Sequence, residues 1–393
     1  MCFSTELYQI ILIYANYSVS LHEICTQIMN IDNFRYELYQ WYEANKRLLP
    51  WRETQDPYKI WLSEIILQQT RVAQGLDYYL RFIDRFPTVQ DLAAAEEDEV
   101  LLLWQGLGYY SRARNLHKAA IEIVESLKLK VERSFESLEL KVDRVGFPKT
   151  FEELRQLPGV GDYTAGAIAS FAYNMPYPAM DGNVYRVLSR IFDDETVFDT
   201  EAGKRHFRAL DEQLLDQTNP RLFNSAIMEF GALYCVPQNP ECDVCPLQRF
   251  CLAYAHHTVE LLPLRKPKNE LKDRYLNYII YLDKAGNTLI HQRTEKDIWQ
   301  HLWEFVEEDA LLNEELNRSQ SELNDEMMDW GISKRLEAKF THVLSHQRIE
   351  ASFKVVKCET LPAIENTKQV AVRDLENYAF SRLTLKALQR LFH

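Results

Sequence analysis

Residues 235–251 read CVPQNPECDVCPLQRFC, and this stretch contains four of the seven cysteines of the chain. Cys235, Cys242, Cys245 and Cys251 have the spacing Cys-x6-Cys-x2-Cys-x5-Cys, which is short enough for four thiolates to converge on one centre. The prolines between them favour tight loops. A group of cysteines this dense is typical of a metal site in a reducing compartment rather than of a disulfide framework.

Two kinds of metal centre suit four thiolate ligands. Zinc is bound by four cysteines in many structural sites, but these sites more often pair two Cys-x2-Cys knuckles. Iron-sulfur clusters are also held by four thiolates, and ligand type favours iron-sulfur over zinc here. From the residues alone we expect an iron-sulfur cluster, with zinc as the alternative.

The composition is that of an ordinary globular chain of 393 residues, with 46% hydrophobic and 26% charged residues. This length exceeds what one hydrophobic core usually serves, so we expect two domains. The net charge of −13 is concentrated: residues 91–99 hold five acidic and no basic residues, and residues 304–329 hold ten acidic and one basic residue. The rest is nearly neutral, with basic groups near Arg112, Arg186 and Arg190 that suggest an asymmetric surface. Global charge therefore does not exclude nucleic acid as a partner.

The first 33 residues precede the first recognisable motif and are interpreted as an N-terminal extension. The apolar run at 7–17 lacks a basic flank and is too short to span a bilayer, so it predicts neither a signal peptide nor a membrane helix. With the cysteine pattern, this indicates a cytoplasmic protein, which we expect to be a nucleoid-associated bacterial monomer.

Residues 34–256 have mostly helical apolar spacing and predict a mainly α domain. One stretch differs: Leu127, Leu129 and Val131 alternate with charged residues, and the same alternation returns after a short polar segment. This pattern predicts a hairpin-like insertion at 127–145.

The second half of the chain has a different pattern. The prolines and basic residues of 257–269 are typical of a linker. Beyond it, β-rich stretches at 275–282 and 351–356 flank an acidic, helix-compatible stretch at 308–329. Residues 270–393 are therefore predicted to form a smaller α+β domain.

A second motif lies at 157–167, which reads LPGVGDYTAGA. Gly159 and Gly161 stand in a turn before a helix, where exposed backbone N–H groups suit a phosphate. Pro-Gly-x-Gly alone is an ordinary turn. Its significance comes from its context, because Asp181-Gly182-Asn183-Val184 and then the cysteine stretch lie downstream.

The order of these three motifs resembles that of the endonuclease III and MutY family of helix-hairpin-helix DNA glycosylases, densely from residue 34 to 264 and sparsely to 393. The resemblance implies a helix-hairpin-helix domain with a 4Fe-4S cluster and a C-terminal NUDIX-like domain. It also implies a base-excision-repair enzyme that binds double-stranded DNA and hydrolyses the N-glycosidic bond of adenine mispaired with 8-oxoguanine or guanine.

Breaking this bond requires a proton for the leaving purine and a carboxylate that stabilises oxocarbenium charge on the sugar. Glu64 stands in a strongly apolar helix, where burial raises a carboxyl pKa towards that of a general acid, although a lone Glu is more often a surface group. Asp181 is also a natural helix N-cap. By the resemblance, Glu64 is the acid, Asp181 stabilises the sugar and Asn183 supports the site.

Tyr163 stands where relatives that resemble endonuclease III carry a lysine that forms a Schiff base with the sugar. Tyrosine cannot form one. The sequence therefore predicts a monofunctional enzyme that leaves an abasic site, with Tyr163 hydrogen-bonding near Asp181.

The target base must leave the DNA stack to be excised. By the resemblance, residues that intrude beside the oxidised guanine are Gln69 and Tyr109, and the pocket-side residues are Arg47, Leu49, Trp51 and Arg52. Each of these alone could be a packing residue.

The resemblance is weaker in the C-terminal half. Leu302-Trp303-Glu304-Phe305 resembles the family's Trp-Glu-Phe stretch, and Ser345 and His346 match its lesion-reading loop, with Leu344 in place of a phenylalanine. The NUDIX hydrolase signature is missing from 304–329, so pyrophosphate hydrolysis is not expected.

Two other functions stay open at this point. One is a thymine-mismatch or oxidised-pyrimidine glycosylase of the same fold, which would also lack the lysine. The other is a noncatalytic iron-sulfur DNA-binding protein, against which Glu64 and Asp181 argue.

Overall fold

The computed structural model describes residues 30–136, 147–267, 270–308 and 337–392. The described residues divide into two compact units, each built from two separate stretches of the chain. The first unit consists of the described residues within Met1–Ile65 and Leu138–Pro267. The second unit consists of the described residues within Ile66–Ser137 and Lys268–His393. These units do not match the sequential boundaries expected at 34–256, 257–269 and 270–393, which stay a prediction.

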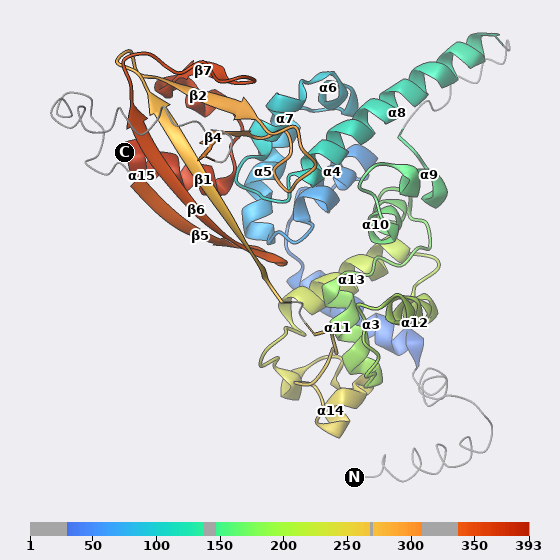
Figure 1. Ribbon diagram of the computed structural model, residues 1–393. Helices are drawn as coiled ribbons and strands as arrows, with labels where there is room; N and C mark the ends of the chain where they lie inside the picture. Colours follow the sequence, from blue (N-terminus) through green and yellow to red (C-terminus); the bar gives the residue numbers. More distant parts are fainter. Residues whose placement is uncertain (1–29, 137–146, 268–269, 309–336, 393) are drawn as a thin grey trace. The chain divides into compact units, whose positions relative to one another are not determined.

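In the first unit the described residues form helices connected by loops (Figure 1). These helices are α3 (Ile31–Asn45), α9 (Phe151–Gln156), α10 (Asp162–Tyr173), α11 (Gly182–Phe192), α12 (Glu201–Leu214), α13 (Pro220–Leu233), η1 (Cys242–Val244), η2 (Gln248–Phe250) and α14 (Leu252–His256). The helix α4 (Pro57–Leu67) begins in the same unit. Several of these helices begin at a side-chain N-cap, which accepts a hydrogen bond from a backbone N–H group of the first turn. The caps include Asn30 for α3, Asp181 for α11 and Asn219 for α13.

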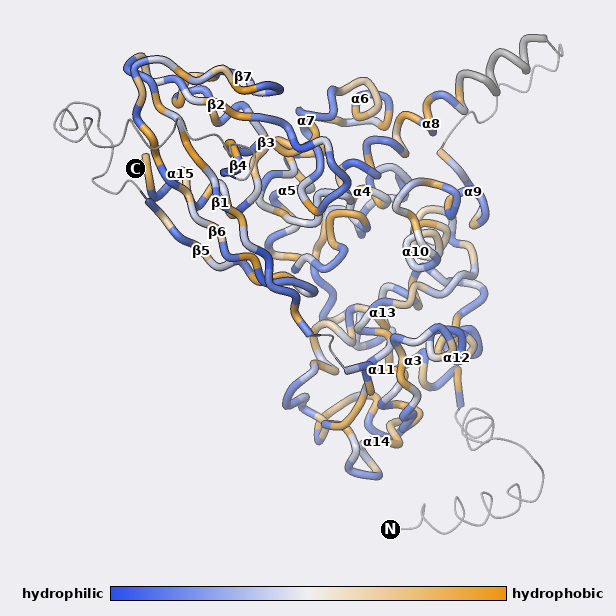
Figure 2. The backbone as a smooth tube through the Cα atoms, in the orientation of Figure 1, coloured by the Kyte–Doolittle hydropathy of each residue, from blue (hydrophilic) through white to orange (hydrophobic). Residues whose placement is uncertain are grey.

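Helix α10, which comes directly after the glycine turn, is buried along most of its length. All residues from Thr164 to Ala172 are buried, in agreement with the largely hydrophobic colouring of α10 in Figure 2. A Cβ atom on Gly166 would lie 2.5 Å from the carbonyl oxygen of Pro178, so the chain approaches the helix too closely there for any side chain. The helix ends at Asn174, in the left-handed conformation.

The first stretch of the second unit contains the helices α5 (Val72–Arg85), α6 (Val89–Ala94), α7 (Glu97–Trp104) and α8 (Ser111–Glu136). The long α8 contradicts the hairpin-like insertion expected at 127–145, because its residues up to Glu136 are helical. Ile123, Leu127 and Val131 also recur every four residues, a helical spacing that outweighs the local alternation. The rest of that prediction, at 137–145, lies outside the described residues.

The second unit also contains two sheets. Their strands are β1 (Lys272–Leu282), β2 (Asn287–Gln292), β3 (Trp303–Glu304), β4 (Val306–Glu307), β5 (Glu337–Val343), β6 (Gln347–Lys357) and β7 (Lys368–Ala371). One sheet has the order β4-β1-β6-β5, with β1 and β6 parallel and the other pairs antiparallel, and the other sheet has the order β3-β2-β7. The β-rich stretches expected at 275–282 and 351–356 lie within β1 and β6.

The C-terminal helix α15 (Arg382–Phe392) packs on β5 (Figure 1), and the 3-10 helix η5 (Val372–Asn377) directly follows β7. Alternate residues of β6 are buried, among them Ile349, Ala351 and Phe353, as expected for a strand with one face towards a core. Most of the acidic stretch expected to be helical, at 309–329, lies outside the described residues. The helical first half and the α+β second half agree with the predicted fold class.

A buried group of charges ties the sheets together. The guanidinium of Arg293, which is 8% exposed, donates hydrogen bonds of 2.7 Å to Glu304, 2.8 Å to Glu307 and 2.9 Å to Asp297. The hydroxyl of Tyr278 donates a 3.0 Å hydrogen bond to Glu304. Because each buried acid has a donor, this group is a structural network. No helix of the described residues is long and apolar enough to cross a membrane.

Candidate functional site

Glu64, in helix α4, and Tyr163, near the start of α10, meet in the first unit. The hydroxyl of Tyr163 donates a 2.8 Å hydrogen bond to Oε2 of Glu64, which is 7% exposed. Burial raises the pKa of Glu64, although the hydrogen bond from Tyr163 and the charge of Arg52 oppose the rise. Glu64 is thus a buried carboxyl biased towards its protonated form, as a general acid requires.

Asp181 caps helix α11 with one carboxylate oxygen, which accepts hydrogen bonds of 2.8 Å from the Asn183 backbone N–H and 2.9 Å from that of Val184. Its other oxygen accepts a 2.7 Å hydrogen bond from the Asn183 side chain. Burial raises the pKa of Asp181. The three hydrogen-bond donors oppose this rise, because they stabilise the charged carboxylate. The cap and a charge-stabilising role are compatible, because the donors fix the carboxylate in place.

Asn183 is held in turn by Arg186, one turn further along α11. Arg186 Nη2 donates hydrogen bonds of 2.9 Å to the side-chain oxygen of Asn183 and 2.6 Å to the carbonyl of Gly231. Its Nε donates a 2.7 Å hydrogen bond to the carbonyl of Cys235. A Cβ atom on Gly231 would lie 2.7 Å from the Cβ of Asn183, so α13 approaches α11 closely at this point.

The sequence reasoning missed this role of Arg186. It placed Arg112, Arg186 and Arg190 on a basic surface, but their exposed fractions are 9%, 5% and 1%. Each guanidinium has several backbone carbonyls as acceptors, which compensates its burial. The four-residue spacing of Arg186 and Arg190, within a run of Val, Leu and Ile, was the available signal that both face the interior.

The pocket-side residues expected from the sequence also lie in the first unit. Arg47 donates hydrogen bonds of 2.6 Å and 2.7 Å to the two carboxylate oxygens of Glu229, a buried acid that sequence reasoning missed. Arg52 donates a 2.7 Å hydrogen bond to Ser225 and lies over the ring of Phe171.

Leu49 and Trp51 are buried, as packing residues are. Trp51 and Arg52 nevertheless line a cavity of about 230 Å³, together with Arg221 and Ser225. Part of the expected pocket segment is therefore accessible from a cavity, and part of it is core.

The glycines of the hairpin motif are exposed. Gly159 has a φ angle of 76°, which favours glycine, and Gly161 is the N-cap residue of α10, with open space around its Cα. Among the described residues, no side chain caps this helix start. An exposed helix start of this kind is compatible with an anion, and the phosphate contact stays a prediction.

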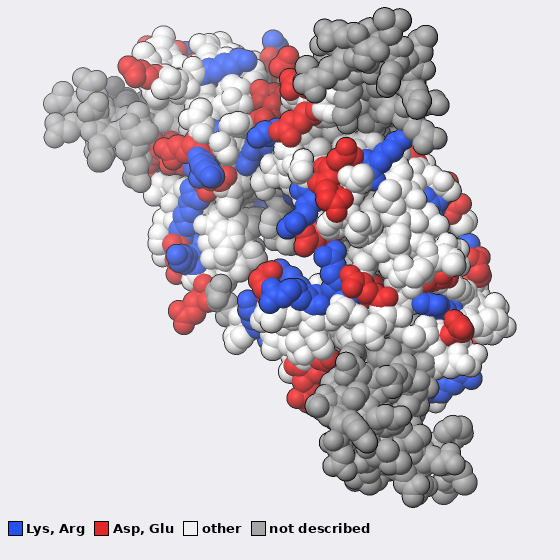
Figure 3. All heavy atoms as spheres, turned by 90° about the vertical axis from the view of Figure 1, so that its right-hand side faces the viewer, with Lys and Arg blue, Asp and Glu red and all other residues white. Residues whose placement is uncertain are grey.

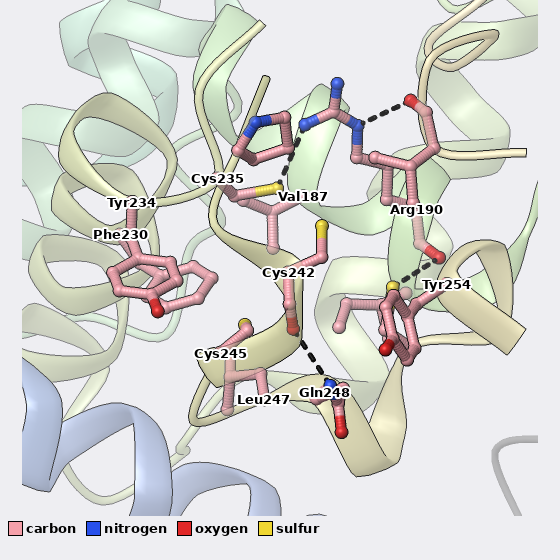
Figure 4. Close-up of a pocket in the computed structure, with 14 residues that line it drawn as sticks. Val187, Arg190, Phe230, Tyr234, Cys235, Cys242, Cys245, Leu247, Gln248 and Tyr254 are labelled. Carbon is pink, nitrogen blue, oxygen red and sulfur yellow. Dashed lines mark hydrogen bonds between the residues drawn. The ribbon is translucent and has the colours of Figure 1, made fainter. Parts of the chain in front are cut away.

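The four cysteines line one pocket of the first unit (Figure 4). They come from the end of α13, from η1 and from the loops around η2. Apolar side chains, including Val187, Phe230 and Leu247, complete the lining. The described residues contain no group of three His, Cys, Asp or Glu side chains arranged to hold a single metal ion.

Arg190 supports the cysteine pocket from α11. Its Nη1 donates a 3.3 Å hydrogen bond to the sulfur of Cys235 (Figure 4). The same Nη1 donates a 2.8 Å hydrogen bond to the carbonyl of Val236. The sulfur of Cys251 donates a 3.3 Å hydrogen bond to the carbonyl of Arg190. Four thiols in an apolar pocket with a fixed cation beside one sulfur fit an anionic iron-sulfur cluster.

Gln69 and Tyr109, expected beside the lesion, belong to the second unit. Both have left-handed backbones, with φ angles of 56° and 50°, and both are exposed. Arg112 links their loops: its Nη1 donates a 2.7 Å hydrogen bond to the carbonyl of Gln68, and its Nη2 one of 3.1 Å to the carbonyl of Gly108. The structure thus joins the two loops through an arginine whose role the sequence did not reveal.

Ser345 and His346 are exposed in the turn between β5 and β6, in the second unit. The backbone N–H of Leu344 donates a 2.8 Å hydrogen bond to the carbonyl of Gln347, which closes the turn. The side chains of Ser345 and His346 are therefore presented to solvent.

The surface charge is mixed on the face drawn in Figure 3. Lys and Arg side chains lie among Asp and Glu side chains there, so the negative net charge does not form a uniform acidic surface on this face.

Three family models match the chain. Residues 62–210 match the HhH-GPD superfamily base excision DNA repair protein, residues 235–251 match the iron-sulfur binding domain of endonuclease III, and residues 277–390 match the NUDIX domain. These matches confirm the predicted fold class and an iron-sulfur binding domain at residues 235–251, the stretch that contains the four cysteines.

The chain is 32% identical over 353 residues to the adenine DNA glycosylase of Buchnera aphidicola subsp. Schizaphis graminum, a match that covers 89% of this chain and 95% of that protein. It is 42% identical over 245 residues to the adenine DNA glycosylase of Rattus norvegicus, covering 60% of this chain and only 44% of the rat protein. Among solved structures, a thermostable thymine-DNA glycosylase gives a TM-score of 0.50 at 24% identity, covering 57% of this chain and 97% of that one, which supports the fold alone.

Proposed function

The chain belongs to the adenine DNA glycosylase family, and from that premise we propose that it removes adenine from double-stranded DNA by hydrolysing the N-glycosidic bond. The observation that carries the proposal is the buried pair of Glu64 and Tyr163 beside the hydrogen-bonded carboxylate of Asp181. The reaction needs one carboxyl that is protonated and one that is charged. Burial raises the pKa of both carboxyls, and we assign the charged form to Asp181 because three N–H donors face it, whereas Glu64 accepts from one hydroxyl.

Glu64 donates its proton to a ring nitrogen of the adenine, so that the base leaves without a full negative charge. Its burial supports this role, because a buried carboxyl keeps its proton at a higher pH than an exposed one. Tyr163 holds Oε2, so one oxygen of the carboxyl is fixed and the other can carry the proton towards the base.

Asp181 stabilises the positive charge that develops on the sugar as the bond breaks. Three hydrogen bonds from Asn183 and Val184 hold it in one orientation, so little reorganisation is needed when the charge forms. Because Tyr163 cannot form a Schiff base, water completes the reaction and an abasic site remains.

We further propose that the iron-sulfur cluster is of the 4Fe-4S type, on Cys235, Cys242, Cys245 and Cys251. When bound, it fixes the loop from 235 to 251 and contributes to the stability of the first unit. Iron and acid-labile sulfide should be found at four atoms each per chain. One zinc ion per chain, without sulfide, would contradict this assignment.

The proposed substrate is adenine opposite 8-oxoguanine or guanine. Support comes from the exposed Gln69, Tyr109, Ser345 and His346, four side chains able to contact a base opposite the adenine. For location, we propose the bacterial cytoplasm, where thiols stay reduced, and a monomer there.

The experiment uses three duplexes, which contain adenine opposite 8-oxoguanine, thymine opposite guanine, or oxidised thymine. Purified protein is incubated with each duplex, and alkali is added to half of every sample. We expect strand breaks only after alkali, and only in the first duplex. Breaks in the second or third duplex would favour the related glycosylases, and breaks without alkali would contradict a monofunctional reaction.

A further inference from the structure

The loop that carries Tyr109 joins α7 to α8, and residues 105–110 are named the Tyr109 loop. Three of its residues have left-handed backbones: Gly106 at a φ of 92°, Gly108 at 84° and Tyr109 at 50°. A non-glycine residue in this region persists only where surrounding contacts fix it. The side chain of Tyr109 is 46% exposed, with the Arg112 guanidinium 5.7 Å from the centre of its ring.

The helical part of the second unit fixes one side of the loop. The indole N–H of Trp104 donates a 3.0 Å hydrogen bond to the carbonyl of Gly108, which also accepts the bond from Arg112. The hydroxyl of Tyr78 donates a 2.7 Å hydrogen bond to the carbonyl of Gln105. These contacts are local, because even Tyr78 lies only 27 residues from Gln105 in the sequence.

The C-terminal part of the same unit fixes the other side, through one residue. The backbone N–H of Phe380 donates a 2.8 Å hydrogen bond to Oε1 of Gln105. The hydroxyl of Tyr110 donates a 3.1 Å hydrogen bond to the carbonyl of Phe380 and accepts one of 3.2 Å from the N–H of Gly106. Both backbone groups of Phe380 are therefore used by the Tyr109 loop.

Phe380 is itself firmly placed. Its side chain is fully buried and stacks on Phe305, at 5.9 Å between ring centroids. The carbonyl of the preceding residue, Ala379, accepts a 2.8 Å hydrogen bond from the N–H of Trp303. The next residue, Ser381, accepts a 3.1 Å hydrogen bond from the N–H of Thr384 at the start of α15. The loop is thus tied to a junction between the sheet and the C-terminal helix.

We propose that Gln105 and Tyr110 are positioning residues, through which the C-terminal α+β part sets the conformation of the Tyr109 loop. The inference rests on the proposed function, in which Tyr109 intrudes beside the base opposite adenine. It gives the C-terminal part a second task besides presenting Ser345 and His346. Two hydrogen bonds join the Phe380 junction to the loop, at Gln105 and at Tyr110, so a movement of the junction changes the position of Tyr109.

The test uses three substitutions. Tyr110→Phe removes the hydroxyl and both of its hydrogen bonds but keeps the ring, and Gln105→Ala removes the acceptor for Phe380. Gln105→Glu keeps an acceptor oxygen and serves as the conservative variant. Tyr39→Phe is the matched control, because it loses one hydroxyl hydrogen bond of 3.0 Å, to Asp216, in the other unit.

Two readouts are taken for each variant. The first is the single-turnover rate of adenine excision opposite 8-oxoguanine, measured with and without a second change, Tyr109→Ala. We expect Tyr110→Phe and Gln105→Ala to lower this rate about tenfold, since small misplacements at a site are costly, and to have little effect once Tyr109 is absent. Gln105→Glu and Tyr39→Phe should match the wild-type rate.

The second readout is hydrogen exchange of the backbone N–H groups of Gly106 and Gly108, which does not depend on catalysis. We expect faster exchange in Tyr110→Phe and Gln105→Ala than in the wild type. Unchanged exchange, or a rate loss that persists in the Tyr109→Ala background, would overturn the inference. If the wild type excises no adenine, the proposed function is wrong. Faster exchange in Tyr110→Phe and Gln105→Ala would still support the coupling between the C-terminal part and the loop.

Discussion

The hydroxyl of Tyr163 is predicted to set the pH range in which Glu64 works as an acid. It donates a 2.8 Å hydrogen bond to the carboxyl of Glu64, and this bond partly opposes the rise in pKa that burial causes. Tyr163→Phe removes the donor, so the pKa of Glu64 should rise further. A hydrogen bond to a charged group contributes about 1.5–3 kcal/mol. Above the pKa of Glu64, that change multiplies its protonated fraction by about ten or more.

The assay is single-turnover adenine excision by wild type and Tyr163→Phe over a range of pH. A general acid works only when protonated, so the rate falls as the pH rises through the pKa of Glu64. In Tyr163→Phe this alkaline limb should move to higher pH, even if the maximal rate is lower. Tyr173→Phe is the control. Tyr173 lies in α10, as Tyr163 does, and the substitution removes a 2.9 Å hydrogen bond from its hydroxyl to the carbonyl of Pro148. A Tyr163→Phe limb that stays in place or moves to lower pH would refute the reasoning.

Three further perturbations probe other parts of the chain. Gly231→Ala should lower the excision rate by up to about a hundredfold, because its Cβ would lie 2.7 Å from that of Asn183 and displace it; rates at wild-type level in a folded variant would contradict this contact. Asp211 is fully buried without a hydrogen-bond partner among the described residues, and burial raises its pKa to about 7. Since the raised pKa favours the protonated form, stability should be lost as the pH rises from about 4 to 7, and thermal melts of Asp211→Asn should show less of this loss than the wild type. Arg293→Met should lower the free energy of unfolding in urea by about 3–5 kcal/mol, because Glu304 and Glu307 lose their buried cation; a loss below about 1 kcal/mol would mean that the network is not stabilising.

The sequence was sufficient for features that are local. The cysteine spacing, the apolar helix around Glu64 and the cap at Asp181 each depend on residues close together in the chain, and the structure places them as those patterns indicate. Tyr163 was expected near Asp181. The structure adds that it donates its hydrogen bond to Glu64, 99 residues away.

Long-range pairing is the part that the sequence could not supply. Arg47 meets Glu229 across 182 residues, and Gln105 meets Phe380 across 275 residues. Neither partner carries a local pattern that indicates the other. The division of the compact units was hidden for the same reason, since each unit joins two distant stretches of chain.

Helix α8 shows a different limit. Its sequence satisfies a strand alternation over five residues and a helical spacing over a longer window, and the longer pattern decides, because helix formation is cooperative along the chain. A short window therefore gave the wrong element.

The most direct test of the central claim compares wild type with Glu64→Gln on a duplex that carries adenine opposite 8-oxoguanine. Glutamine keeps the size of the side chain but cannot donate a carboxylic proton. Free adenine released in a single turnover is measured by chromatography, and binding to the same duplex is measured beside it. We predict that the wild type releases adenine and that Glu64→Gln binds the duplex without releasing it. Release by Glu64→Gln at the wild-type rate would contradict the assignment of Glu64 as the acid.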